Sequence, residues 1–140
     1  MAEEINAIIA DINNLDEPSS RRLPLPDDAL IERYEEIVGI KFSDDYIVLL
    51  KNVSNAFVGS ISLLTLNNEM GGIYGELYSA VKQARDAGVP VSWLPICEDN
   101  GDYYCIVPDG KVCFWDHNGA TNELWPDLAT WAREVWLSGK

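Results

Sequence analysis

Hydrophobic residues recur at helical spacing near the start of the chain. In residues 2–15 they fall three and four positions apart with polar and acidic residues between them, which is typical of an amphipathic helix. Residues 18–26 then contain three prolines, and we expect an extended connector there because proline lacks a backbone N–H. The positions expected to face inward in the first helix are Ile5, Ile8, Ile9, Ile12 and Leu15.

Two more helices are predicted before residue 55. One begins at residue 27 or 28 and ends at Gly39, a residue that often closes helices. The next follows Ser43, whose hydroxyl can accept a hydrogen bond from an unpaired N–H, and Asp44 and Asp45 complement the positive end of its dipole. The inward positions are expected to be Leu30, Ile31, Tyr34, Ile37 and Val38, then Tyr46, Ile47, Leu49, Leu50 and Val53.

The middle of the chain predicts a short strand and then a helix. Residues 60–66 form an apolar run that favours a strand. Residues 73–86 return to helical spacing, with Ala87 and Gly88 closing the helix and Ile73, Leu77, Val81 and Ala84 on its apolar side.

Alternating strands and turns characterise residues 93–125. Asn100-Gly101 is a strong hairpin signal because both residues tolerate positive φ, and Asp109-Gly110 repeats the signal. The segments between the turns are rich in β-branched and aromatic residues. A third turn, at residues 117–120, gives an antiparallel meander of up to four strands, and an amphipathic helix with Pro126 in its first turn follows, with Leu128, Trp131, Ala132, Val135 and Trp136 inward.

These elements together predict an α+β fold. A mainly antiparallel sheet, the meander at 93–125, is flanked by N-terminal helices and a C-terminal helix. With 140 residues, 47% of them hydrophobic, the chain is predicted to form one domain, 1–140, with helix 2–15 packed on the rest.

The charge of the chain is strongly negative and uneven. The net charge is −13; residues 1–50 carry twelve acids and four bases, and residues 98–127 carry seven acids and one base. Such a surface repels nucleic acid and anionic membranes and attracts cationic partners. We find no signal peptide and no apolar stretch of the ~20 residues that a membrane span needs, so we expect a cytoplasmic protein with reduced thiols.

Residues 96–119 hold all three cysteines and the one histidine. Cys97, Cys105 and Cys113 could join His117 in a zinc site, and redox chemistry is a further alternative. Structural zinc sites, however, use closely spaced C-x₂₋₄-C pairs, whereas these cysteines are eight residues apart on strands that a meander brings near one another. We therefore expect the cysteines to pack as small buried hydrophobes, with no metal and no cofactor.

The acidic residues of the same segment have a simple explanation as turn residues. Asp and Asn before Gly are what hairpin turns require, and no calcium-loop motif is present. Asp116 cannot easily orient His117, because adjacent strand residues point to opposite faces. No G-x-S-x-G nucleophile motif occurs, so catalysis by a Ser-His-Asp arrangement is not expected.

Three stretches resemble one known family. The sequence "LPICEDNGDYYCIV", then "KVCFWDHNG", then "DLATWAREVW" resembles the SUKH superfamily, which includes bacterial immunity proteins and the fungal Smi/Knr cell-wall regulators. The resemblance covers about residues 27–137. The chain departs from the family pattern at Phe42-Ser43, where Leu-Pro is usual, and at residues 54–56, where Asn-Gly is usual.

The resemblance implies binding rather than catalysis. It points to a non-enzymatic, cytoplasmic immunity protein that neutralises a cognate bacterial toxin, a basic nuclease domain, by covering it with an acidic surface. A regulatory interaction protein like the fungal relatives is one alternative, and a zinc-dependent enzyme that uses residues 97–117 is another. The residues expected to contact the partner are Asp44, Asp45, Glu98, Asp99, Asp102, Tyr103, Tyr104, Trp115 and Asp116.

Overall fold

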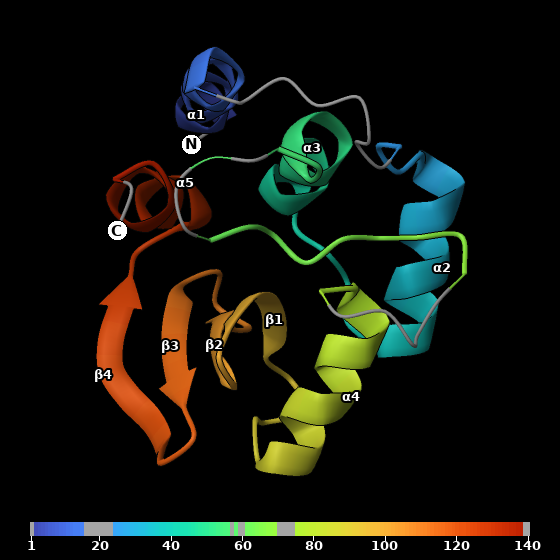
Figure 1. The fold of residues 1–140 in the computed structure, drawn as a ribbon, viewed down its shortest axis with the longest axis vertical. Coiled ribbons are helices and arrows are strands. Elements are labelled where there is room, and N and C mark those ends of the chain that lie inside the picture. The colour runs from blue at the N-terminus through green and yellow to red at the C-terminus, as the bar shows by residue number, and fades with distance from the viewer. Residues whose placement is uncertain (1, 16–23, 57, 59–60, 70–74, 139–140) are drawn as a thin grey trace.

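The fold is α+β, as the sequence predicted, with helices preceding and following a four-stranded antiparallel sheet. The computed structural model describes residues 2–15, 24–56, 58, 61–69 and 75–138. Figure 1 shows the order of the elements, which are α1 (Ala2–Leu15), α2 (Asp28–Val38), α3 (Asp44–Val53), α4 (Leu77–Ala87), β1 (Leu94–Asp99), β2 (Asp102–Ile106), β3 (Val112–Asp116), β4 (Gly119–Trp125), α5 (Leu128–Trp131) and the π-helical turn η1 (Ala132–Trp136).

The first three helices lie where the hydrophobic pattern placed them. Asp27 caps α2 by accepting a hydrogen bond from the Leu30 N–H, and Ser43 caps α3 in the same way. Gly39 ends α2 with φ of 80°, a left-handed conformation that costs a side-chain-bearing residue about 1–2 kcal/mol. Two residues expected inside are exposed: Leu15 and Ile37 lie at the margin of their apolar stripes.

Two predictions for residues 60–86 are wrong in part. The described residues of 60–66 form no strand, although Leu64 donates one backbone hydrogen bond to Ile96 and the leucines of the segment are buried. Helix α4 begins at Leu77 rather than at residue 73, because Glu76 adopts an extended conformation and serves as its cap. Ile73 and the connector residues 18–23 lie outside the described residues.

The meander at 93–125 is confirmed, with strand order β1-β2-β3-β4 and every neighbouring pair antiparallel. Tyr103 lies opposite Trp115, and Cys105 lies opposite Cys113. In the turn between β1 and β2, Asn100 and Gly101 both have positive φ, 55° and 88°, which is the geometry that this dipeptide favours. Between β2 and β3, Gly110 has positive φ but Asp109 does not.

The C-terminal helix is shorter and less regular than its sequence pattern indicates. Pro126 precedes the helix, and Asp127 caps it by accepting a hydrogen bond from the Thr130 N–H at 2.8 Å. After Trp131 the backbone widens into η1. Trp131 and Trp136 are nevertheless buried, as expected, and the Trp136 indole N–H donates to the Val58 carbonyl at 3.2 Å. None of the described helices is long and apolar enough to cross a membrane.

Helices cover both faces of the sheet. On one face, Tyr104 packs against Trp131 of α5, and the main hydrophobic core continues from there to α1, α2 and α3. On the other face, a smaller cluster joins Ala84 of α4 to Tyr103, Cys105 and Trp115. Figure 1 shows α4 running beside the sheet while α1, α3 and α5 gather beyond it. The ends of the hairpins therefore project from between two helical layers.

A buried carboxylate joins α2 to α4. Glu76 is fully buried and accepts hydrogen bonds from the N–H groups of Tyr78 and Ser79, at 2.7 and 3.0 Å, and from the Tyr34 hydroxyl at 2.6 Å. The same hydroxyl accepts a hydrogen bond from the Asn67 N–H at 3.0 Å. Burial, followed by the hydrogen bond to Glu76, raises the pKa of Tyr34, which keeps this donor protonated.

Replacing Tyr34 by phenylalanine tests this network. The Y34F variant leaves a buried carboxylate short of one donor, and the cost of such a deficit is about 1–3 kcal/mol of unfolding free energy. Urea denaturation followed by circular dichroism measures that loss. Tyr78→Phe is the matched control, since the Tyr78 hydroxyl makes no hydrogen bond among the described residues; an equal loss in both variants would contradict the assigned role.

Candidate functional site at the hairpin ends of the sheet

Two turns of the meander lie at the same end of the sheet. The turn that joins β1 to β2 and the turn that joins β3 to β4 are separated along the chain by β2 and β3. Because these two strands run in opposite directions, the chain returns to the same end of the sheet and the two turns lie side by side. Four carboxylates come from these turns, and we call them the acidic rim: Glu98, Asp99, Asp102 and Asp116. Residues 98–102 and 116–119 contain no lysine or arginine, so the rim is uniformly negative apart from His117.

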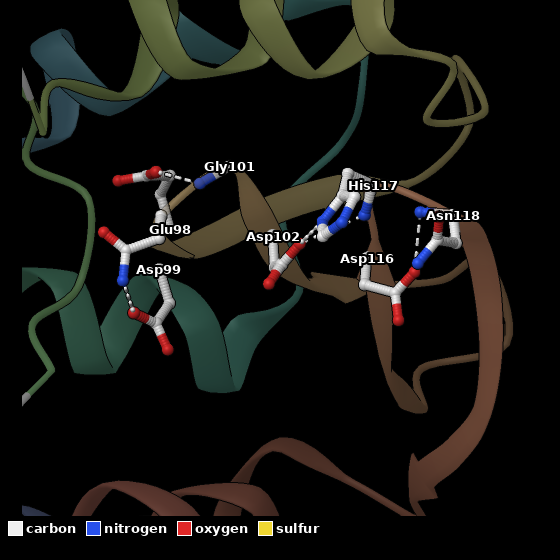
Figure 2. A network of polar contacts seen from close by, with 8 residues as sticks. Glu98, Asp99, Gly101, Asp102, Asp116, His117 and Asn118 are labelled. Atoms are coloured by element: carbon white, nitrogen blue, oxygen red, sulfur yellow. Dashed lines mark hydrogen bonds and ion pairs between the residues drawn. The ribbon is translucent and has the colours of Figure 1, made fainter.

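Backbone N–H groups of the turns hold Glu98 and Asp116 of the rim in place. Glu98 accepts a hydrogen bond from the Gly101 N–H at 2.7 Å, and Asp116 accepts one from the Asn118 N–H at 2.8 Å. Figure 2 shows these contacts, with Asp99 beside Glu98. Asp99 accepts a hydrogen bond from the side chain of Asn100 at 3.3 Å. The turns thus fix where the negative charges lie, as expected for Asp and Asn in tight turns.

Asp102 links the two turns directly. Its Oδ1 atom lies 3.0 Å from the backbone N and 3.1 Å from the ring Nδ1 of His117 (Figure 2). Strand alternation argued against Asp116 as the partner of His117, and the pairing of His117 with Asp102 was not predicted. The strand register could have predicted the Asp102–His117 pair. Because Tyr103 lies opposite Trp115, the start of β2 lies beside the end of β3. His117 itself is exposed, with 73% of its side chain accessible.

Two of the three aromatic anchors predicted beside the acids are buried. Tyr103 and Trp115 are 3% and 4% exposed, because both face α4, where their rings lie 6.0 Å apart. Tyr104 is half-buried on the opposite face, between Phe114, Trp125 and Trp131. Burial, with Glu98 nearby, raises the pKa of Tyr103. We therefore correct the roles of Tyr103 and Trp115 from partner contacts to packing.

Asp44 and Asp45 do not line the acidic rim. They occupy the first turn of α3, where carboxylates are stabilised by the positive end of the helix dipole. Asp44 lines a groove between α2 and α3 to which none of the rim residues contributes. The structure thus places the predicted acids on two surfaces.

The cysteines do not converge on one point. The two-residue turn at Asn100-Gly101 sets Cys97 opposite Tyr104, so Cys97 lies on the sheet face of the main core, whereas Cys105 and Cys113 share the opposite face. The described residues contain no group of three or more Cys, His, Asp or Glu side chains that could hold a metal ion. A zinc site formed by these three cysteines and His117 does not fit this geometry.

The thiols are also poor nucleophiles in their present surroundings. Burial raises the pKa of Cys97 to about 12, with Asp99 and Glu98 adding to the shift, and burial raises the pKa of Cys105 as well. The thiolate is the reactive form, so both groups stay protonated and inert at neutral pH. Cys113 is more accessible than the other two, although its pKa is also raised.

Thiol titration in the folded protein tests this arrangement. We expect Ellman's reagent at mildly alkaline pH to modify Cys113 first, while Cys97 and Cys105 react only as fast as the protein unfolds. Concentrated guanidinium should expose all three cysteines. Cys113→Ser should remove the early phase; two rapidly reacting thiols in the native protein would contradict the burial of Cys97 and Cys105.

Comparison with known proteins identifies the family. The SUKH_5 family model, described as SMI1-KNR4 cell-wall, matches residues 5–137, so the match begins inside α1 and extends further than the resemblance expected from residue 27. A crystal structure of a protein from Pseudomonas syringae pv. tomato is 32% identical to this chain, with a TM-score of 0.86 and coverage of 95% of this chain and 98% of that one. No curated protein matches the chain. The chain therefore belongs to the SMI1-KNR4 family of the SUKH superfamily.

Proposed function

We propose that this protein is a non-catalytic, cytoplasmic binding module that neutralises a cognate bacterial toxin. The toxin is a nuclease, and the protein acts by covering its basic cleft. Family membership supports this proposal because many bacterial members of the SUKH superfamily are immunity proteins. The acidic rim supplies the physical means.

The uniform charge of the acidic rim is the observation that carries the proposal. A nuclease must present cations to the phosphates of its substrate. Carboxylates accept charge-assisted hydrogen bonds from arginine and lysine, and an acidic surface also speeds the encounter with a basic partner. Four carboxylates, three of them held by backbone N–H groups, with no lysine or arginine in the same turns offer such a surface.

The chemistry of the 96–119 segment supports a role without bond making. Its thiols are held protonated, and Asp102 and His117 pair at an exposed turn, where solvent surrounds the imidazole. Enzymes place their acid–base groups where water is controlled and charge interactions are strong. Inhibition by occlusion requires neither condition.

A regulatory interaction protein is a second candidate. The matched family is described as SMI1-KNR4 cell-wall, and the resemblance to the fungal Smi/Knr regulators implies a regulatory interaction. Such a protein would use the same kind of binding surface without a toxin. The neighbouring gene separates the two candidates, because an immunity protein is expected beside the gene of a secreted toxin.

Co-expression with the toxin encoded by the neighbouring gene tests the proposed function. We expect the protein to restore growth of cells that produce the toxin, and to bind the purified toxin with an affinity that falls as salt increases, since the contact is electrostatic. Titration calorimetry at low and high salt measures that dependence. Failure to protect cells together with no binding at low salt would refute the antidote role.

A charge reversal in the acidic rim tests which surface binds. Asp99→Lys places a cation in the rim, and Asp109→Lys is the matched control in the turn at the other end of the sheet. Each variant changes the net charge from −13 to −11. We expect D99K to weaken toxin binding by about tenfold, which corresponds to roughly 1.4 kcal/mol, and D109K to change it little. Equal losses would indicate that only the total charge matters.

A further inference from the structure

A second acidic surface lies on the helical layer, away from the rim. It is a groove of about 640 Å³ between α2 and α3, and the loop that follows Gly39 also lines it. The carboxylates that line it are Asp28, Glu32, Glu35, Glu36 and Asp44, against a single lining lysine, Lys41, among the described residues. We call it the α2–α3 groove.

Three of the groove carboxylates form a stripe along α2. Asp28, Glu32 and Glu36 are spaced four residues apart, so they lie one above another on one side of the helix over about 12 Å. Like charges at this spacing repel each other and destabilise an isolated helix. Their presence on one line is therefore a cost to the free protein.

The chain relieves only part of that repulsion. Asp28 pairs with Lys51 of α3 at 2.7 Å, and Glu35 accepts a hydrogen bond from the Phe42 N–H at 2.8 Å. The first contact connects α2 to α3, and the second connects α2 to the loop between the two helices. Glu32, Glu36 and Asp44 are exposed and have no cationic partner among the described residues.

The floor of the groove is apolar. Ile31 and Phe42 are almost fully buried beneath it, while Ile40 and Ile47 are partly exposed along it. An apolar floor between carboxylate walls is matched by a segment with aliphatic side chains on one face and cations beside them. An amphipathic helix supplies that arrangement, since residues at i and i+4 lie on the same side.

We infer that the α2–α3 groove binds a basic amphipathic helix of a partner protein. Its lysines or arginines, four residues apart, pair with Glu32 and Glu36, and its aliphatic face covers Ile40 and Ile47. The inference rests on the proposed function only in taking the partner to be a basic protein; the groove and the acidic rim are separate surfaces.

A synthetic helix tests the inference without knowledge of the partner. The probe is a fluorescein-labelled peptide of about 15 residues made of leucine and lysine, with lysines four residues apart on one side. A scrambled peptide of identical composition lacks the stripe. We expect the ordered peptide to bind about tenfold more tightly than the scrambled one by fluorescence anisotropy, and to shift the amide signals of α2 and α3 in NMR spectra.

Paired charge reversals locate the binding. Glu32→Lys with Glu36→Lys alters the groove, whereas Asp109→Lys with Glu134→Lys alters exposed acids outside it. Both double variants change the net charge from −13 to −9. We expect E32K/E36K to weaken binding of the ordered peptide by about tenfold or more and the control variant to change this affinity little. The two variants should have equal melting temperatures. Equal weakening, no binding, or equal binding of the scrambled peptide would overturn the inference.

The peptide assay and the growth assay together separate the groove from the antidote role. Peptide binding as described, with no protection of toxin-producing cells by the wild-type protein, would refute the proposed function and leave the groove assignment in place. Protection by the wild-type protein without peptide binding would refute the groove and leave the antidote role in place.

Discussion

The fold depends on the buried contact between Glu76 and Tyr34. A carboxylate removed from water is costly unless donors surround it, and here two backbone N–H groups and one hydroxyl do so. The contact fixes the start of α4, and through Tyr34 it attaches α4 to α2 and to the backbone of Asn67. The backbone around Thr65 adds two hydrogen bonds to residues 75 and 77. The helices α2 and α4, which are far apart in sequence, are thereby held in fixed positions relative to each other.

The position of α4 determines which side chains of the sheet are exposed to solvent. Because Ala84 and Val89 pack on Tyr103, Cys105 and Trp115, the large aromatic residues of that face are turned inward. The α5 helix covers Tyr104 on the other face. What remains at the surface is the end of the sheet, where short polar and acidic turn residues project. The exposure of the acidic rim is therefore a consequence of covering both faces of the sheet, since only turns are left exposed at its end.

Local rules were sufficient to predict much of this structure. Helical spacing located α1, α2 and α3, and Asn100-Gly101 located the first hairpin, because these signals depend on neighbours in the sequence. The sequence places Glu76 inside the predicted helix 73–86, because its burial against Tyr34 depends on a residue 42 positions away. To predict that Tyr103 and Trp115 face the interior also requires knowledge of where α4 packs. The Asp102–His117 pair, in contrast, follows from strand register and could have been inferred from the turns.

The hydrogen bonds within the rim have a thermodynamic consequence for recognition. Side chains that are free in solution lose conformational entropy when a partner immobilises them, at about 0.5–1.5 kcal/mol each. Glu98, Asp102 and Asp116 are already oriented by the N–H groups of Gly101, His117 and Asn118. A partner that docks on this end of the sheet meets preorganised acceptors, so more of the gross interaction energy remains as affinity.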